Sequence, residues 1–330
     1  RSFDGLVSLQ GDIATSVASG VQVRLTPEEL RRLESRGEVI PETYDAYLRA
    51  MYRIRRETGR GMREAMDLLM DTVENDPTSA LAWAGLAYGY GELGHSPFPE
   101  EDAYPRAKAA ADRALELDPD LAEAHLAVAV YRMYYEWDFA GAEVAFERAI
   151  EINPSLVSAH YHLAWLYELY GKDEEALRLG ELTKELDPLS PFYSGWLAEQ
   201  YRDAEMFDKA IEEANATLKL RRGYPVGFLV LGETYTDLGE FDKAIEYHEK
   251  LKDNYYWSFA LAATLGKAGR IEEARELTQE IEKRGAASLV MVLIYASMGD
   301  YDAAYGWLLK ARDDRIPWYP WLLKWYPQTE

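Results

Sequence analysis

Residues 157–190 read VSAHYHLAWLYELYGKDEEALRLGELTKELDPLS, and this stretch contains the pattern that decides the fold. Apolar residues recur at helical spacing on both sides of Gly171. They are Leu163, Ala164 and Tyr167 before the glycine, and Ala176 and Leu179 after it. Glycine readily ends a helix in the left-handed conformation, whereas Pro188 cannot continue a helix but suits the first turn of the next one. The stretch therefore predicts two amphipathic helices followed by the start of a third.

The same arrangement recurs along the chain. Asp-Pro or Asn-Pro pairs end at Pro77, Pro119, Pro154 and Pro188, with spacings of 42, 35 and 34 residues. An alanine lies twelve residues before each proline, and the series continues beyond the last one: Ala65, Ala107, Ala142, Ala176, Ala210, Ala244, Ala274 and Ala304. We expect each alanine to let the second helix of a pair approach the first closely. A glycine stands five residues before four of these alanines, at Gly171, Gly239, Gly269 and Gly299. The last three glycines are 30 residues apart, which predicts shorter second helices there.

The order Trp-x-x-Leu-Gly-x-x-Tyr, then Ala, then Pro resembles the tetratricopeptide repeat, a helix-turn-helix unit of 34 residues. The resemblance implies an all-α fold: a right-handed α-α superhelix of about eight repeats, filling residues 41–314. The units are placed at residues 43–79, 80–121, 122–156, 157–190, 191–224, 225–254, 255–284 and 285–314.

Residues 1–40 lie outside the repeat. They combine an apolar helical stripe from Phe3 to Val17, an alternating strand-like segment at 21–25, and a helix start capped by Thr26. Phe3-Asp-Gly-Leu-Val-Ser-Leu-Gln, Val23-Arg-Leu-Thr-Pro-Glu-Glu and Tyr44-Asp-Ala-Tyr-Leu-Arg-Ala, in this order, resemble the C-terminal repeat region of multidomain bacterial signalling proteins. In that family a winged-helix regulator, an adenylate cyclase or a Ser/Thr kinase domain lies upstream. The resemblance implies that residues 1–40 are a helix-strand remnant of an upstream α/β domain, and that the chain is truncated at both ends.

Two further segments interrupt or end the pattern. Pro97 and Pro99 predict a protruding loop at residues 95–102. Residues 315–330 include Ile316-Pro-Trp-Tyr-Pro-Trp-Leu-Leu-Lys-Trp-Tyr-Pro, an aromatic-rich end. We expect this segment to cap the open apolar face of the last repeat.

Composition excludes several classes of function. The chain carries 36 Lys+Arg against 58 Asp+Glu, a net charge of −22, which argues against binding nucleic acid or anionic lipid. The absence of cysteine excludes disulfides and thiolate metal sites, and suits a cytoplasmic location. No apolar run approaches the roughly 18 residues of a membrane helix. His125 and His160 occupy a repeat position usually held by Trp and are expected to pack between helices. No catalytic motif, metal site or cofactor site is predicted, so we expect a non-catalytic protein.

The informative positions are those of the first helices that point into the concave groove of such a superhelix. They are Tyr88, Tyr134, Tyr161, His162, Trp165, Glu168, Trp196, Glu199, Arg202, Glu233, Thr236 and Asp237. Exposed aromatic residues mixed with acids are typical of protein-recognition surfaces. The hypothesis is a protein-protein interaction or regulatory scaffold of a signalling protein, binding a peptide or domain there.

Trp165 and Trp196 fall at nearly equivalent positions of adjacent repeats, so their rings should be neighbours. The competing interpretation is that they only fill the gap between repeats. Acids at Glu199, Glu233 and Asp237 disfavour an acidic peptide and favour a basic or aromatic one, or another domain of the same polypeptide. The alternative function is a small-molecule sensor that encloses a ligand between the two tryptophans; a homodimer is a further option for the assembly.

Overall fold

A computed structural model describes all residues except 1–40, 57–59, 95–101, 255–256 and 326–330. The expected apolar stripe, strand and helix cap of residues 1–40 lie outside the described residues, as does all of the expected loop except Asp102. No strand occurs in the part of the chain that the structure describes.

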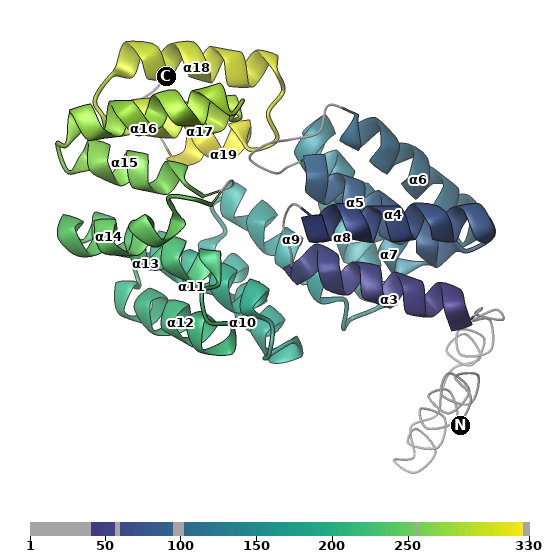
Figure 1. The fold of residues 1–330 in the computed structure, drawn as a ribbon. Helices are drawn as coiled ribbons and strands as arrows, with labels where there is room; N and C mark the ends of the chain where they lie inside the picture. The colour runs from purple at the N-terminus through teal and green to yellow at the C-terminus, as the bar shows by residue number, and fades with distance from the viewer. Residues whose placement is uncertain (1–40, 57–59, 95–101, 255–256, 326–330) are drawn as a thin grey trace.

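The described residues form an all-α right-handed superhelix of paired helices (Figure 1). The eight pairs are α3 (Pro41–Arg56) with α4 (Arg60–Asn75), α5 (Ala80–Gly94) with α6 (Ala103–Leu117), α7 (Ala122–Tyr131) with α8 (Phe139–Ile152), α9 (Val157–Leu169) with α10 (Asp173–Leu186), α11 (Pro191–Asp203) with α12 (Phe207–Leu220), α13 (Pro225–Asp237) with α14 (Phe241–His248), α15 (Phe259–Lys267) with α16 (Ile271–Lys283), and α17 (Ser288–Ser297) with α18 (Tyr301–Asp313). The π-helix η1 (Arg132–Glu136) extends α7, the 3-10 helix η2 (Glu249–Leu251) extends α14, and α19 (Tyr319–Trp325) ends the described chain.

The alanine series marks the crossings within the pairs. Every one of the eight alanines is at most 1% exposed, which confirms their predicted role at close helix contacts. The four glycines also end first helices as predicted, with φ between 72° and 77°. Trp137 and Glu205 hold the equivalent left-handed position with φ of 57°, although side chains disfavour it by about 1–2 kcal/mol. The fold therefore tolerates some strain where glycine is missing.

A repeated hydrogen bond joins three of the first helices, α5, α7 and α9, to the turn before each of them. The indole Nε1 of Trp83 donates to the carbonyl of Pro77 at 3.1 Å. His125 Nε2 lies 2.9 Å from the carbonyl of Pro119, and His160 Nε2 lies 2.8 Å from that of Pro154. The two histidines thus replace tryptophan in a structural role, as expected.

The shorter spacing near the C-terminus is accommodated differently from the prediction. Only α14, with 8 residues before η2, is a shortened second helix, whereas α16 and α18 keep 13 residues. The first helices α15 and α17 are shorter instead, with 9 and 10 residues. The second helices keep their length because the deletion is absorbed at the start of the following first helix.

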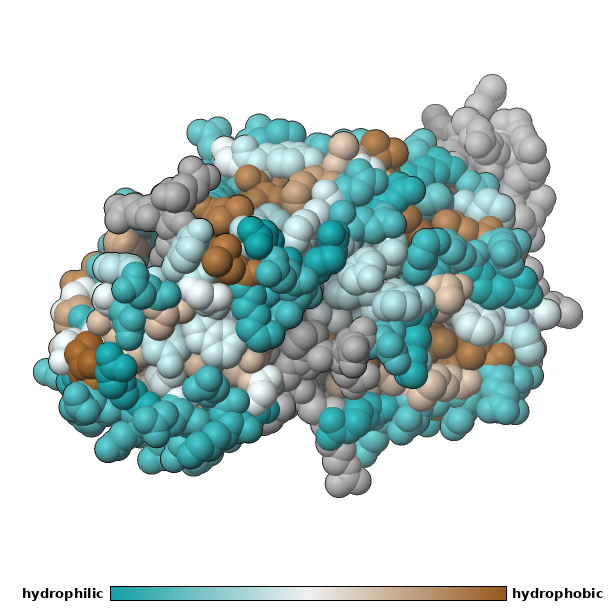
Figure 2. All heavy atoms as spheres, turned by 90° about the horizontal axis from the view of Figure 1, so that it is seen from above, coloured by the Kyte–Doolittle hydropathy of each residue, from teal (hydrophilic) through white to brown (hydrophobic). Residues whose placement is uncertain are grey.

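The C-terminal segment, residues 315–325, has two sets of contacts. Ile316, Tyr319 and Leu322 pack against Ala311 and Leu308 and neighbouring residues of the last repeat. The segment also turns inward, and α19 lies between the last repeat and the middle of the array (Figure 1). Figure 2 shows the array from above, with a mostly hydrophilic surface on which hydrophobic residues form separate patches.

Candidate binding surface on the inner face

The first helices of the pairs form the face that we call the inner face, and its middle is aromatic. Trp165 on α9 and Trp196 on α11 have ring centroids 5.7 Å apart at an interplanar angle of 78°, which confirms that they are neighbours. Trp196 in turn lies 6.1 Å from Trp257, before α15. On the other side, Tyr161 packs edge-to-face on Trp165 at 6.4 Å. We call Tyr134, Tyr161, Trp165 and Trp196 the aromatic half of the inner face.

His162 occupies a buried polar cluster behind this surface. Its Nε2 lies 3.2 Å from Tyr88 Oη and 3.4 Å from Glu92 Oε1, and its Nδ1 lies 3.4 Å from Tyr134 Oη. Its ring also stacks on Phe146 at 6.0 Å. The cluster joins α5, η1 and α9, which gives Tyr88 and His162 a place in the core between three repeats.

The C-terminal segment covers the aromatic half. The Trp321 ring stacks on Tyr134 at 5.7 Å, and its Nε1 donates to the carbonyl of Trp165 at 3.2 Å. Trp318 lies between Tyr134, at 5.2 Å, and Trp165, at 5.6 Å. Trp321 is completely buried.

These contacts correct one expectation about the predicted residues. Tyr88, Tyr134, Tyr161, His162 and Trp165 are buried, not exposed. The reason is that α19 packs on Tyr134 and Trp165, while Tyr88 and His162 point into the polar cluster. Trp196 is half-buried, so it is the predicted aromatic residue that keeps most contact with solvent.

Beyond the aromatic half, carboxylates gather around one guanidinium. Arg202 on α11 contacts Glu199 at 2.6 Å, Asp203 at 2.8 Å, Glu233 at 3.7 Å and Asp237 at 2.7 Å. We call these five residues the acidic half of the inner face. Lys267 adds a second cation 3.7 Å from Asp237. The structure thus brings together four acidic and basic residues that the sequence predicted as a group, and adds Asp203 and Lys267.

Burial and mutual repulsion raise the pKa of two of these acids, Asp203 and Glu233. Burial raises the pKa of Asp203 to about 7; Arg202 opposes this shift, while Glu199 and Asp237 add to it. Burial, reinforced by Glu199, also raises the pKa of Glu233 well above its ordinary value. The acidic half therefore carries more carboxyl groups than its own cations neutralise.

Glu168 connects the two halves and is reached by the C-terminal segment. Its Oε1 accepts a hydrogen bond from Gln200 Nε2 at 2.9 Å. Lys324 Nζ donates to the Glu168 carbonyl and lies 3.2 Å from Asp173 Oδ1. Burial raises the pKa of the Glu168 carboxyl, and the charge of Lys324 partly opposes this. Lys324 also lowers the pKa of Asp203, so its charge acts on both halves.

Thr236 has a structural place instead of a surface one. It is buried, and its Oγ1 donates to the Gly232 carbonyl at 2.8 Å. Its hydroxyl also lies 3.2 Å from that of Thr264, which is 2.8 Å from His248 Nδ1. The expectation that Thr236 lines the groove is corrected because this network between α13, α14 and α15 takes up its hydroxyl.

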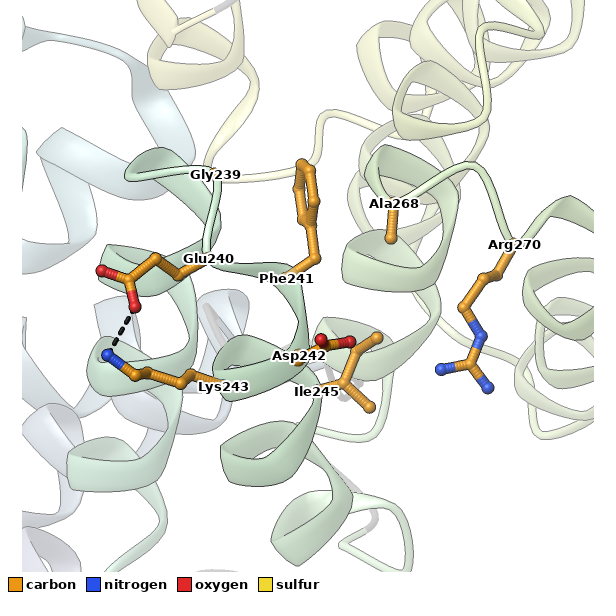
Figure 3. A pocket seen from close by; sticks show the side chains of 8 residues that line it. All are labelled: Gly239, Glu240, Phe241, Asp242, Lys243, Ile245, Ala268 and Arg270. Atoms are coloured by element: carbon orange, nitrogen blue, oxygen red, sulfur yellow. Dashed lines mark ion pairs between the residues drawn. The ribbon is translucent and has the colours of Figure 1, made fainter.

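A separate hollow of about 540 Å³ lies between the start of α14 and the turn between α15 and α16 (Figure 3). Phe241 and Ile245 extend from α14 on one side, with Ala268 and Arg270 on the other. Lys243 forms an ion pair with Glu240 at its edge. The hollow is not lined by Trp165 or Trp196, the residues of the expected small-molecule site.

Three residues important to the inner face were missed by the groove prediction: Trp318, Trp321 and Lys324. A usable signal was present, because they are spaced three residues apart, which is the spacing of residues on one side of a helix. Within the described residues, none of the helices has both the length and the apolar character to span a bilayer. The same residues contain no group of three or more His, Cys, Asp or Glu side chains that could hold a metal ion.

Comparisons with known proteins agree with this architecture. The tetratricopeptide repeat family matches residues 145–178 and 228–253. A stretch of 87 residues is 32% identical to a putative adenylate cyclase 3 of Rhizobium meliloti (strain 1021), covering 26% of this chain but only 15% of that protein.

Two solved structures illustrate the similarity in fold. The APC/C hetero-tetramer Cut9-Hcn1 matches with a TM-score of 0.62 and 15% identity, over 87% of this chain and 56% of that one. A monomeric mutant of IFIT1 with m7Gppp-AAAA matches with a TM-score of 0.63 and 16% identity, over 98% of this chain and 74% of that one. At these identities the likeness shows the fold alone.

Proposed function

The chain carries an array of tetratricopeptide repeats, a fold that supports protein-protein interaction, and from this premise we propose that it is a non-catalytic module that captures a protein segment on its inner face. The observation that carries the proposal is the direct continuation of an aromatic surface into a cluster of carboxylates. Trp196, which is half-buried beside Trp165, offers apolar contact area, and the partly exposed carboxylates of Glu233 and Asp237 offer acceptors for a cation. A segment with an aromatic anchor and a basic residue would gain both contributions.

We further propose that the module belongs to a cytoplasmic bacterial signalling protein. The support is the similarity of one stretch to an adenylate cyclase, together with the resemblance of residues 1–50 to signalling proteins. In this role, capture of a partner would alter the array, and the change would pass to an effector domain in the same polypeptide.

An unbiased peptide-display selection against the intact chain tests the capture proposal. We expect selected peptides to be rich in aromatic and basic residues. Trp196→Ala should weaken them at least tenfold without changing the helical content measured by circular dichroism, because aromatic hot spots contribute about 2–4 kcal/mol. If Trp196→Ala unfolds the array, the tryptophan only fills the gap between repeats; if peptides bind the variant normally, the inner face is not the capture surface.

Glu233→Lys tests whether the negative charge of the acidic half contributes to binding of the selected peptides. We expect it to weaken the selected peptides, whereas Glu272→Lys makes the same charge change at an exposed position of α16 and should not. Equal weakening by both variants would show a response to net charge alone and would contradict capture at the inner face.

A further inference from the structure

We propose that the partner is an amphipathic helix with two large aromatic residues three positions apart and a lysine or arginine three positions further on, and that α19 occupies the binding surface for this helix in the free chain. This inference rests on the proposed function and specifies its partner. The positions in the chain's own segment are Trp318, Trp321 and Lys324.

The two aromatic residues, Trp321 and Trp318, are held by the inner face in a way that suits a docked helix. Trp321 lies against Tyr134 and Phe139, at 5.7 and 6.1 Å, while its indole N–H donates to the carbonyl of Trp165. A side chain from another helix thus fills this position with both apolar contact and a directed hydrogen bond. Trp318, the residue directly before α19, adds a second contact with Trp165, and its carbonyl accepts a hydrogen bond from the Leu322 N–H at 3.0 Å, so it lies at the start of this helix. The spacing of three residues is the helical spacing that such a pair of contacts requires.

Lys324 shows charge complementarity with the surface on which it docks. Its Nζ donates to the carbonyl of Glu168 near the end of α9, where the helix dipole favours a cation. Lys324 also opposes the upward pKa shifts of Glu168, which connects the two halves, and of Asp203 in the acidic half. A hydrophobic segment used only to cap the last repeat would not need a cation at this place.

The surface under α19 can exchange one helix for another. The seven residues of α19 are too few for a stable isolated helix, so its order depends on docking. Lys324 remains about one-third exposed, and Trp318 is only half-buried. In the combined site, five carboxyl groups (Glu168, Glu199, Asp203, Glu233 and Asp237) face three cations (Arg202, Lys267 and Lys324). A partner helix that continues with another basic residue toward Glu233 would therefore have an advantage over α19.

When α19 is displaced, the surface that it occupies should become available to a peptide added in trans. The probe is a fluorescently labelled peptide with the sequence of residues 315–330, RIPWYPWLLKWYPQTE, titrated against full-length chains by anisotropy. We expect the Trp321→Ala chain to bind it at least tenfold more tightly than the intact chain does, because α19 no longer competes. Changing Trp321 to Ala or Lys324 to Glu in the peptide should reduce that binding at least fivefold.

A second variant distinguishes displacement of α19 from a loss of folding caused by Trp321→Ala. Lys324→Glu leaves the aromatic contacts in place and should increase peptide binding at least threefold, whereas Lys283→Glu, the same change at an exposed position of α16, should leave it as in the intact chain. Equal binding by the intact, Trp321→Ala and Lys324→Glu chains would overturn the proposal. So would a dimer of the intact chain, detected by light scattering, that dissociates on Trp321→Ala, because α19 would then serve a second copy.

The display selection separates this inference from the proposed function. If selected peptides require Trp196 but lack the aromatic-x-x-aromatic-x-x-basic pattern, capture on the inner face stands and the partner specified here is wrong. If neither selected peptides nor the 315–330 peptide bind the inner face, both proposals fail.

Discussion

The aromatic half and the acidic half of the inner face are built at comparable repeat positions yet end in different states. In the aromatic half, Tyr134 and Trp165 are covered by Trp318 and Trp321 of the same chain. In the acidic half, Glu233 and Asp237 keep about a quarter of their side-chain surface exposed. The repeat supplies the scaffold in both cases, whereas a distant segment decides which half is accessible.

The two halves also differ in the free energy that they contribute. A buried tryptophan removes roughly 200 Å² from water, worth several kcal/mol at about 25 cal/mol per Å². A partly exposed ion pair contributes about 0–1 kcal/mol and acts mainly on association rate and selectivity. We therefore expect the aromatic half to determine affinity and the acidic half to determine which segments are accepted.

The largest effect should come from Trp321→Ala, which removes the contact that covers the aromatic half. Replacing a fully buried tryptophan costs about 3–5 kcal/mol when the structure cannot relax. Here we expect about 3 kcal/mol, because α19 is terminal and can undock. Tryptic cleavage after Lys324 should accelerate while circular dichroism keeps most of its helical signal. Tyr305→Ala, at an exposed position of α18, should have little effect; unchanged cleavage in Trp321→Ala would show that the aromatic half does not hold α19.

The second prediction tests whether the two halves share one scaffold. Ala142 and Ala244 occupy the same repeat position, on α8 beside the aromatic half and on α14 beside the acidic half, and both are completely buried. Ala244→Leu should destabilise the array by about 1–3 kcal/mol, because added carbons overpack the helix crossing. Ala142→Leu should cost a similar amount in chemical denaturation, whereas Ala140→Leu, on the exposed side of α8, should not. No change in melting for Ala244→Leu would mean that the repeat phase is wrong.

These examples show which features the sequence could predict. The buried alanines and the left-handed glycines follow from short-range geometry that repeats along the chain, so eight pairs could be placed before any contact was known. The Trp165–Trp196 contact follows for the same reason, since it joins equivalent positions of neighbouring repeats.

The covering of the inner face could not be predicted in this way. Trp321 and Trp165 are 156 residues apart, and nothing in the repeat period encodes a contact between them. The burial of Tyr134 depends on the same segment, and the burial of His162 depends on polar partners in the two preceding repeats. Position within a repeat predicts the direction of a side chain, but its exposure depends on what packs against it.

The third prediction concerns the pH response of the acidic half. Because the pKa of Asp203 is about 7 in the folded chain and near 3.8 without perturbation, the folded state holds more protons between these values. The contribution of Asp203 to stability therefore falls as the pH rises through this window. Asp203→Asn removes this loss. The free energy of unfolding of the variant minus that of the native chain should therefore rise by about 1 kcal/mol from pH 5 to pH 8.

Comparing variant with native chain is necessary because His248 acts in the opposite direction. Burial lowers its pKa to about 4, so its contribution to stability falls as the pH drops from 6.5 toward 4. This response is common to both proteins and cancels in the difference between them. Asp208→Asn, at an exposed position of α12, is the control. A difference between Asp203→Asn and native that does not change with pH would show that Asp203 is ionised throughout.

The smallest effect should come from Glu233→Lys, measured with the 315–330 peptide on the Trp321→Ala chain. Glu233 lies beyond the position of Lys324, so its charge should attract a basic peptide over a distance without making the main contact. We expect about fivefold weaker binding at low salt, mostly from slower association, which corresponds to about 1 kcal/mol. At about 1 M salt the Debye length falls to about 3 Å, and the difference should become less than twofold.

Salt dependence separates the two halves most directly. Trp196→Ala should weaken the same peptide equally at low and high salt, because apolar burial is not screened, whereas Glu233→Lys should lose its effect as salt is added. Glu272→Lys corrects for the change in net charge, since it alters the total charge equally from an exposed position of α16. A Glu233→Lys effect that persists at high salt would mean that Glu233 makes a direct, desolvated contact with the peptide. The expectation that the aromatic half alone determines affinity would then be wrong, because the acidic half would contribute to affinity as well.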